Sequence, residues 1–145
     1  MSSTNSIFLK AALVAATIGL TQPMVAICGE LSLSFSAEAG KQGKVHFAVY
    51  DNTNDWMKKP VSSAVIPLVN AAAEITLPGL TNGDYAVSAF LDLNGNDKLD
   101  RNFIKMPTEP YGFSNGATGS FGPPPFDKAK FTLGTEPVRI AVPLR

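Results

Sequence analysis

The sequence predicts an all-β protein, a single-domain antiparallel β-sandwich of about seven strands. Apolar residues recur at every second position in several short segments, which is the period of a strand with one buried face. Turn-forming Gly, Pro, Asn and Asp residues separate these segments. No segment after residue 28 shows the apolar spacing of an amphipathic helix. With 145 residues, 45% of them apolar, the chain is of a suitable size and composition for one packed domain.

Residues 1–28 have the layout of a secretory signal peptide. Lys10 precedes the apolar run AALVAATIGL, and TQPMVA follows with Pro23 and the small residue Ala26. The run is shorter than the roughly 20 residues that cross a bilayer. We therefore expect an exported protein, periplasmic or extracellular, with a β-sandwich domain at residues 29–145 and no membrane span after signal cleavage.

Cys28, the single cysteine, lies at this boundary. The sequence VAIC loosely resembles a lipoprotein cleavage box, but Ile27 stands where a small residue is expected. Cleavage after Ala26, cleavage after Cys28 and lipidation of Cys28 therefore stay open. Without Lys10, the chain has 11 basic and 12 acidic residues and a net charge of −1. This balance argues against a nucleic-acid partner.

Two alternating segments open the predicted domain. ELSLSFS (30–36) and KVHFAVY (44–50) each place apolar residues on one face. The Gly-containing turn EAGKQG separates them, so we expect a hairpin. The predicted buried face consists of Leu31, Leu33, Phe35, Val45, Phe47 and Val49.

The middle of the chain alternates strand and turn signals. DNTNDWMKKP (51–60) is polar and irregular, and in VSSAVIPLVN (61–70) Pro67 indicates a short or edge strand. In AEITLPGL (73–80), Ile75 and Leu77 are expected in the core. A turn at residues 82–83 leads to a segment that is apolar on both faces, which predicts a central strand.

A long irregular segment, residues 105–128, precedes the closing strands. It is rich in Gly and Pro, and it carries Tyr111, Phe113, Phe121 and Phe126. Because aromatic rings are costly to leave in water, we expect an ordered loop that its aromatic residues hold against the sandwich. KFTL and PVRIAVPLR then predict closing strands, with Val138, Ile140 and Val142 on one face.

The order of NGN, KLD, YGFSN and FGPP between Leu77 and Phe131 resembles the secreted bacterial family DUF2141. The resemblance implies a small exported all-β domain, and this family has no assigned activity. The chain departs from the family pattern at Leu91, where His is usual, and at Asp97, where Gly is usual. LPGLTNGDYAV is also similar to the strand-turn-strand of transthyretin-like and collagen-binding B-type modules, which implies a transthyretin- or immunoglobulin-like sandwich.

DLNGNDKLD (92–100) is a candidate calcium loop. Calcium prefers oxygen ligands, and the spacing matches the first part of an EF-hand loop, with the Lys98 carbonyl at position seven. Asp97 stands where Gly is expected, and Phe103 replaces the bidentate Glu. A weak site of about 10⁻⁴ to 10⁻³ M and a metal-free turn both stay open. The candidate ligands are Asp92, Asn94, Asn96, Lys98 and Asp100.

No catalytic constellation stands out, so we expect a non-catalytic binding or accessory module. The lone His46 lies on the outward face of its strand, which indicates a surface histidine. The alternatives are a hydrolase that uses paired carboxylates in the Asp92–Asp100 loop and a purely structural cell-surface protein. The partner would be a carbohydrate, a peptide or an envelope protein. The candidate ligand-binding residues are Trp56, Tyr111, Phe113 and Phe121, although Trp56 also fits packing at the sandwich edge.

Overall fold

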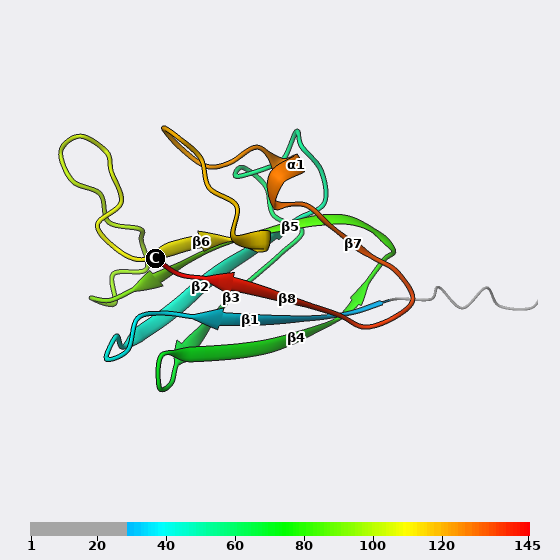
Figure 1. Cartoon of the computed structure of the whole chain (residues 1–145), viewed down its shortest axis with the longest axis horizontal. Coiled ribbons are helices and arrows are strands. Elements are labelled where there is room, and N and C mark those ends of the chain that lie inside the picture. Colours follow the sequence, from blue (N-terminus) through cyan, green and yellow to red (C-terminus); the bar gives the residue numbers. More distant parts are fainter. Residues whose placement is uncertain (1–28) are drawn as a thin grey trace, which may run out of the picture.

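The computed structural model describes residues 29–145, so the predicted signal peptide and Cys28 lie outside the described residues. Two β-sheets form the body of this part of the chain (Figure 1). One sheet has the strand order β4-β1-β8, and the other has the order β3-β2-β5-β6, with β7 also pairing with β5. The strands are β1 (Gly29–Ser36), β2 (Gly43–Tyr50), β3 (Ser62–Leu68), β4 (Ala72–Leu80), β5 (Gly83–Asp92), β6 (Tyr111–Phe113), β7 (Phe131–Leu133) and β8 (Val138–Pro143).

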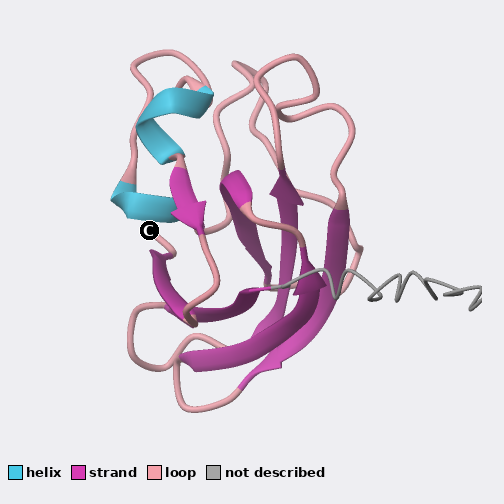
Figure 2. Cartoon of the chain, turned by 90° about the vertical axis from the view of Figure 1, so that its right-hand side faces the viewer, coloured by secondary structure: helices cyan, strands magenta, loops and turns pink. Residues whose placement is uncertain are grey.

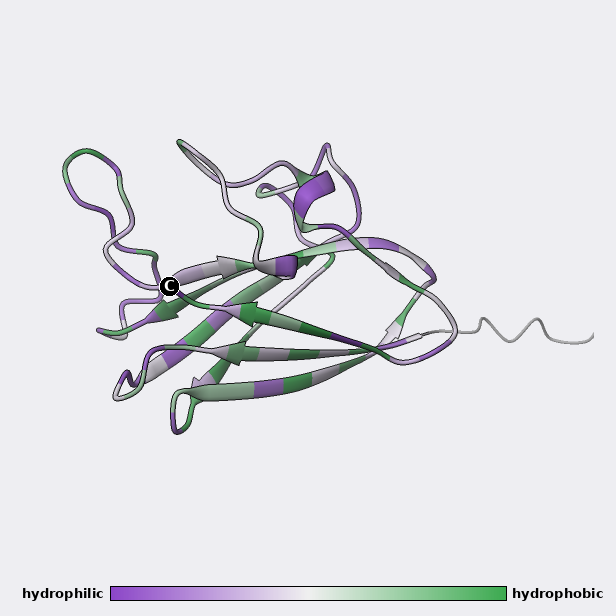
Figure 3. Ribbon diagram, viewed as in Figure 1, coloured by the Kyte–Doolittle hydropathy of each residue, from purple (hydrophilic) through white to green (hydrophobic). Residues whose placement is uncertain are grey.

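The core lies between the two sheets, which confirms the predicted sandwich. Hydrophobic and hydrophilic residues alternate along the strands (Figure 3), as a strand with one buried face requires. From β1 and β2, all six residues predicted to face inward are buried, and they pack with the inward residues of β5. Other buried members are Tyr85, Val87, Ala89, Leu91, Leu133, Val142 and Leu144.

The predicted hairpin between β1 and β2 is wrong. β1 pairs with β4 and β8, whereas β2 pairs with β3 and β5, so the two strands belong to different sheets. Residues 37–42 carry the chain from one sheet to the other. An alternating pattern fixes which face of a strand is buried, but it does not fix the hydrogen-bonding partner. Either pairing would have buried the same six side chains.

Two further details differ from expectation. β1 and β8 run parallel, so the three-stranded sheet is mixed rather than antiparallel. The chain reaches β8 from β7 in the other sheet, and no hairpin therefore dictates its direction. The long segment also contains a one-turn helix, α1 (Phe126–Ala129), and a 3₁₀ turn, η1 (Ser114–Gly116). Elements this short give no periodic signal in a sequence.

Two other expectations, on β3 and β5, are confirmed. β3 is an edge strand that pairs only with β2, and Pro67 lies near its end. β5 is central, because β2 pairs with one edge while β6 and β7 share the other. Among residues 29–145, no helix is long and apolar enough to cross a membrane.

A second apolar cluster covers part of the outer face of the five-stranded sheet. Trp56, which is 9% exposed, donates from Nε1 to the carbonyl of Pro124 at 2.8 Å. Its ring meets Tyr50 edge-on at 4.9 Å and lies near Phe113 and Phe126 at 5.9 and 5.8 Å. Trp56 therefore joins the loop 51–60 to the segment that contains α1. Figure 2 shows these short helices together on one side of the strands.

We expect Trp56→Ala to destabilise the protein by about 3 kcal/mol, because it leaves a cavity and removes a buried hydrogen bond. Urea unfolding followed by far-ultraviolet circular dichroism measures the change. Phe103→Ala is the matched control, since that ring is 96% exposed and its loss should cost no more than about 0.5 kcal/mol. Equal stability of the two variants would contradict the anchoring role.

Candidate functional site

A groove of about 410 Å³ lies on the outer face of the five-stranded sheet. Its floor is formed by outward side chains of β2 and β5, among them His46, Ser88 and Phe90. Two loops, residues 99–107 and 119–123, contribute its walls and project on the same side of the sheet (Figure 1). A smaller depression of about 130 Å³ lies on the outer face of the other sheet, beside Arg139. Only the first of these two has the size of a usual small-molecule site.

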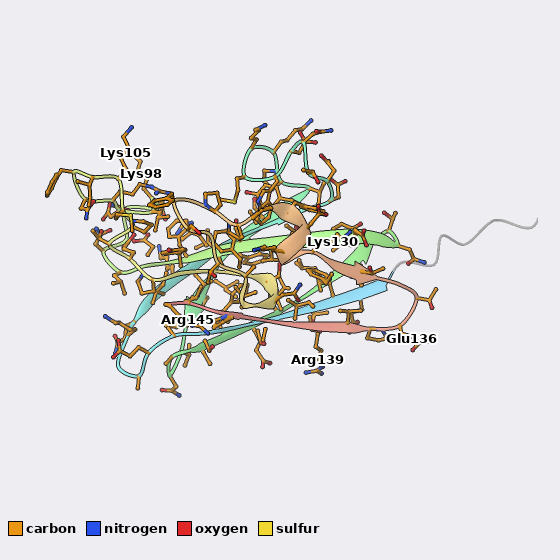
Figure 4. The ribbon with its side chains drawn as sticks, turned by 45° about the horizontal axis from the view of Figure 1, so that its top comes forward. Lys98, Lys105, Lys130, Glu136, Arg139 and Arg145 are labelled. Atoms are coloured by element: carbon orange, nitrogen blue, oxygen red, sulfur yellow. The ribbon has the colours of Figure 1, made fainter. Side chains whose placement is uncertain are left out.

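The lining of the groove is mostly apolar, and it also includes cationic side chains. Aromatic and thioether side chains line it, together with Arg101, Lys105 and His46. Figure 4 shows Lys98 and Lys105 extending from the same loop region, on the side opposite to Glu136 and Arg139. None of the lining residues within the described part of the chain is Asp or Glu. Such a surface suits a ligand with an apolar body and a negative charge.

Three of the four predicted aromatic residues line this groove. Tyr111 is 39% exposed, and Phe113 forms part of the buried floor. Phe121 is fully exposed at the tip of its loop, so the expectation that it holds the loop against the sandwich is wrong. Trp56 is buried behind the groove and offers little surface to a ligand. Its packing supports Phe113 instead.

His46 belongs to a polar cluster at one end of the groove, so the expectation of an ordinary surface histidine is wrong. Its side chain is only 15% exposed and stacks on Phe90, with ring centroids 4.7 Å apart. Nε2 lies 3.5 Å from Oδ2 of Asp92 and 3.4 Å from Oδ1 of Asp97. The β2–β5 register places His46 opposite Phe90 and Lys44 opposite Asp92, which makes His46 and Asp92 diagonal neighbours. Sequence reasoning missed this contact because it requires the strand register.

The Asp92 carboxylate organises the start of the loop. Oδ1 accepts the backbone N–H groups of Gly95 at 2.7 Å and Asn96 at 3.3 Å, and Oδ2 accepts that of Asp97 at 2.8 Å. Gly95 and Asp97 have positive φ angles of 75° and 60°. Burial raises the pKa of Asp92, but these hydrogen bonds and the nearby His46 outweigh it and hold that pKa below its usual value.

The remaining predicted calcium ligands gather around Asp100. Nδ2 of Asn94 donates to its Oδ2 at 2.6 Å, and Nδ2 of Asn96 donates to its Oδ1 at 2.9 Å. The backbone N–H of Lys98 donates to Oδ1 of Asn96 at 2.9 Å. The structure therefore brings Asn94, Asn96 and Asp100 together, whereas Asp92 accepts a separate set of backbone bonds. These internal bonds are those of a self-capped turn, and a calcium ion would have to replace the amide–carboxylate pairs.

Glu109, which sequence reasoning did not single out, closes this loop. The side chain is buried, at 6% exposed, and both of its carboxylate oxygens are paired. Oε1 accepts the N–H of Leu93 at 2.9 Å, and Oε2 accepts that of Asp100 at 3.0 Å. Both ends of the predicted calcium loop are thus tied to one side chain. An acidic residue in a Gly- and Pro-rich segment normally indicates solvent exposure, so the sequence carries no signal for this role.

Comparisons with known proteins gave a family match and a structural similarity. The family model described as "Uncharacterized protein conserved in bacteria (DUF2141)" matches residues 36–141. Among solved structures, the chain is similar to a pilus-presented adhesin, with 13% sequence identity and a TM-score of 0.32. This similarity covers 83% of the chain but only 27% of the adhesin's length. A comparison with curated proteins found no match.

The lowered pKa of Asp92 predicts an acid-dependent loss of stability. The stabilisation is complete above the unfolded-state pKa of about 4 and is lost as the pH falls through the lower folded-state pKa. Asp92→Asn should therefore lower stability at pH 7 and flatten the stability profile between about pH 5 and pH 2. Urea midpoints measured with a chelator present test this expectation.

Glu136→Gln serves as the control for that profile. Glu136 is an exposed carboxylate in the turn before β8, remote from the loop. If Asp92→Asn and Glu136→Gln shared the wild-type profile, the buried hydrogen bonds of Asp92 would have no energetic role in the pH dependence.

Proposed function

The chain belongs to the DUF2141 family of uncharacterized bacterial proteins, and we propose that it is an exported, non-catalytic binding module. Its ligand is a small amphipathic anion, a molecule with an apolar body and a carboxylate or similar group. The observation that carries this proposal is the lining of the groove, in which aromatic side chains meet cationic ones without an acidic residue among the described residues.

The size and shape of the groove support a small ligand. Its volume of about 410 Å³ falls within the usual range for small-molecule sites, about 300–1,000 Å³. Phe90 from the floor, Tyr111 from β6 and Phe121 from the loop offer three ring surfaces to an apolar body. Because Phe121 is fully exposed, covering it also provides a hydrophobic gain on binding.

The cationic side chains of Arg101 and Lys105 favour a negatively charged ligand over a neutral one. Nη1 of Arg101 donates to the carbonyl of Lys105 at 3.0 Å, which restrains the guanidinium beside the groove. A guanidinium has five N–H donors, so most of them remain for a ligand carboxylate. An acidic, apolar segment of a peptide or envelope protein presents the same chemistry. A neutral carbohydrate would leave the cations without a counter-charge.

The hydrolase alternative has less support from the geometry. A general acid in a glycosidase needs a raised pKa, whereas hydrogen bonds and His46 hold the pKa of Asp92 below its usual value despite burial. Both oxygens of Asp100 also accept amide N–H groups. His46 does line the groove, but it contacts Phe90 and two carboxylates, and no bond to a nucleophile accompanies these contacts in the described part of the chain.

Weak calcium binding remains part of the proposal for the 92–100 loop. The side chains of Asn94, Asn96 and Asp100 already lie together, but the two amides meet Asp100 through their N–H groups, so an ion would have to turn both amides to reach their oxygens. Without the bidentate Glu, the affinity should be about 10⁻⁴ to 10⁻³ M, so calcium would serve to stiffen the loop at extracellular concentrations.

A fluorescent amphipathic anion tests the groove. Anilinonaphthalene sulfonate should bind the folded protein, and octanoate should displace it at a concentration about tenfold lower than octanol does, because only octanoate pairs with the cations. Tyr111→Ala and the double variant Arg101→Gln/Lys105→Gln should each weaken dye binding about tenfold. Fluorescence titration measures all three effects.

Two controls separate this site from non-specific binding. Val65→Ala removes an exposed apolar side chain from β3, and Arg139→Gln removes a cation from the opposite sheet. Neither residue lines the groove, so both variants should bind the dye like the wild type. Equal displacement by octanoate and octanol, or unchanged binding in the groove variants, would contradict the proposed ligand class.

A further inference from the structure

We propose that His46, Asp92 and Asp97 form a binding site for a divalent transition-metal ion of the zinc type. The site lies where β2 and β5 meet the start of the 92–100 loop, at one end of the groove. It differs from the calcium site expected from the sequence, because it uses His46 and Asp97 and shares only Asp92 with the predicted calcium ligands. The assignment does not presuppose the proposed groove ligand, although His46 also lines the groove.

The spacing of the donor atoms supports this assignment. His46 Nε2, an Asp92 oxygen and an Asp97 oxygen all lie within 4.8 Å of one another. The two nitrogen–oxygen separations are 3.5 and 3.4 Å. Two ligands held at zinc bond lengths of about 2.0–2.1 Å in a tetrahedron are about 3.4 Å apart. One ion can therefore bridge the imidazole and both carboxylates after a small movement of Asp97, whose side chain is 69% exposed.

The unpaired nitrogen of His46 is the second, independent observation. Nε2 is buried from solvent, yet within residues 29–145 it has no hydrogen-bond partner. Buried polar atoms are nearly always paired, because an unpaired one costs roughly 1–3 kcal/mol. The groups that face Nε2 are the carboxylates of Asp92 and Asp97, which accept hydrogen bonds but cannot donate them. Either a proton on Nε2 or a metal ion must therefore lie between the imidazole and the two anions, and the close grouping of the three donor atoms favours the metal ion.

The ligands are already held in position. Stacking on Phe90 fixes the plane of the His46 ring. Asp97 donates its backbone N–H to Oδ2 of Asp92, so the same contact that positions the buried carboxylate brings Asp97 next to it. Asp92 itself is fixed by two further N–H groups. Groups that orient ligands in this way commonly strengthen a metal site.

The donor set favours a transition metal over calcium. Calcium takes six to eight oxygen ligands, whereas imidazole nitrogen suits zinc, cobalt, nickel and copper. Two carboxylates supply the charge that a divalent ion requires, and three protein ligands leave one position for water. The competing explanation is a protonated His46 between two carboxylates, with no metal at all.

Zinc titration of the purified protein, prepared without a histidine tag and stripped with a chelator, tests the site. Competition with a chromophoric zinc chelator should show one zinc per chain. His46→Gln and Asp97→Asn should each lower the zinc affinity at least tenfold, because loss of a ligand should cost no less than the roughly 10- to 100-fold that loss of an outer-shell partner costs. Cobalt should give the strong visible absorption of a tetrahedral complex in the wild type and lose it in both variants.

The controls distinguish the zinc site from its neighbours. Asp100→Asn should weaken calcium binding and leave zinc affinity unchanged, whereas Asp97→Asn should do the reverse. Since Asp97 does not line the groove, Asp97→Asn should still bind the fluorescent anion, with an affinity no lower than that of the metal-free wild type, so failure of one proposal is separable from failure of the other. Asn tolerates the positive φ of residue 97, which protects the fold of this variant.

Two results would overturn the assignment. Zinc affinity that is equal in the wild type, His46→Gln and Asp97→Asn would show adventitious binding to surface carboxylates. An absence of zinc binding to the wild type at millimolar concentration would leave the cluster as a His–Asp ion pair.

Discussion

The fold depends on the burial of β5 on both of its faces. Its inward residues meet β1 across the core, and its outward residues support a second apolar layer that contains Trp56 and Phe113. β5 also has hydrogen-bonding partners along both edges, so neighbouring elements surround it on its faces and on its edges. The groove exists because the second layer covers only one end of this outer face. At the other end, Ser88, Phe90 and His46 are left for the loops to enclose.

Asp92 marks the point where this strand ends and the loop begins. A buried carboxylate is costly unless it is paired, and here three successive backbone N–H groups pair it. The chain must curl tightly to deliver those groups, which explains the positive φ angles at Gly95 and Asp97. The curl determines where residues 99–107 begin and therefore where one wall of the groove lies. The carboxylate of Glu109 likewise accepts two backbone N–H groups, those of Leu93 and Asp100, and so holds the two ends of the loop together.

The sequence was sufficient for the burial pattern but not for the pairing. Period-two spacing predicted the inward faces of β1, β2 and β8, because alternation is a property of each strand alone. It could not show that β1 and β2 lie in different sheets, since the partner of a strand depends on residues far away in the chain. The same limit explains His46. Its outward orientation was predictable, but its proximity to Asp92 follows only from the β2–β5 register. Glu109 shows the reverse case. Its charge predicts a solvent-exposed side chain, whereas two backbone N–H groups pair its carboxylate and allow it to be buried.

The two proposed sites share His46, and their charges make them interdependent. Without a metal and with a neutral imidazole, Asp92 and Asp97 place two negative charges beside a groove that is proposed to bind an anion. A divalent ion in the cluster cancels those charges, so the repulsion felt by the anion falls. Metal binding should therefore strengthen anion binding, and because coupling between two ligands is reciprocal, the anion should strengthen metal binding by the same factor. The apolar groove and the polar cluster would then act as one binding unit, in which the ion sets the electrostatics and the aromatic rings supply the contact area.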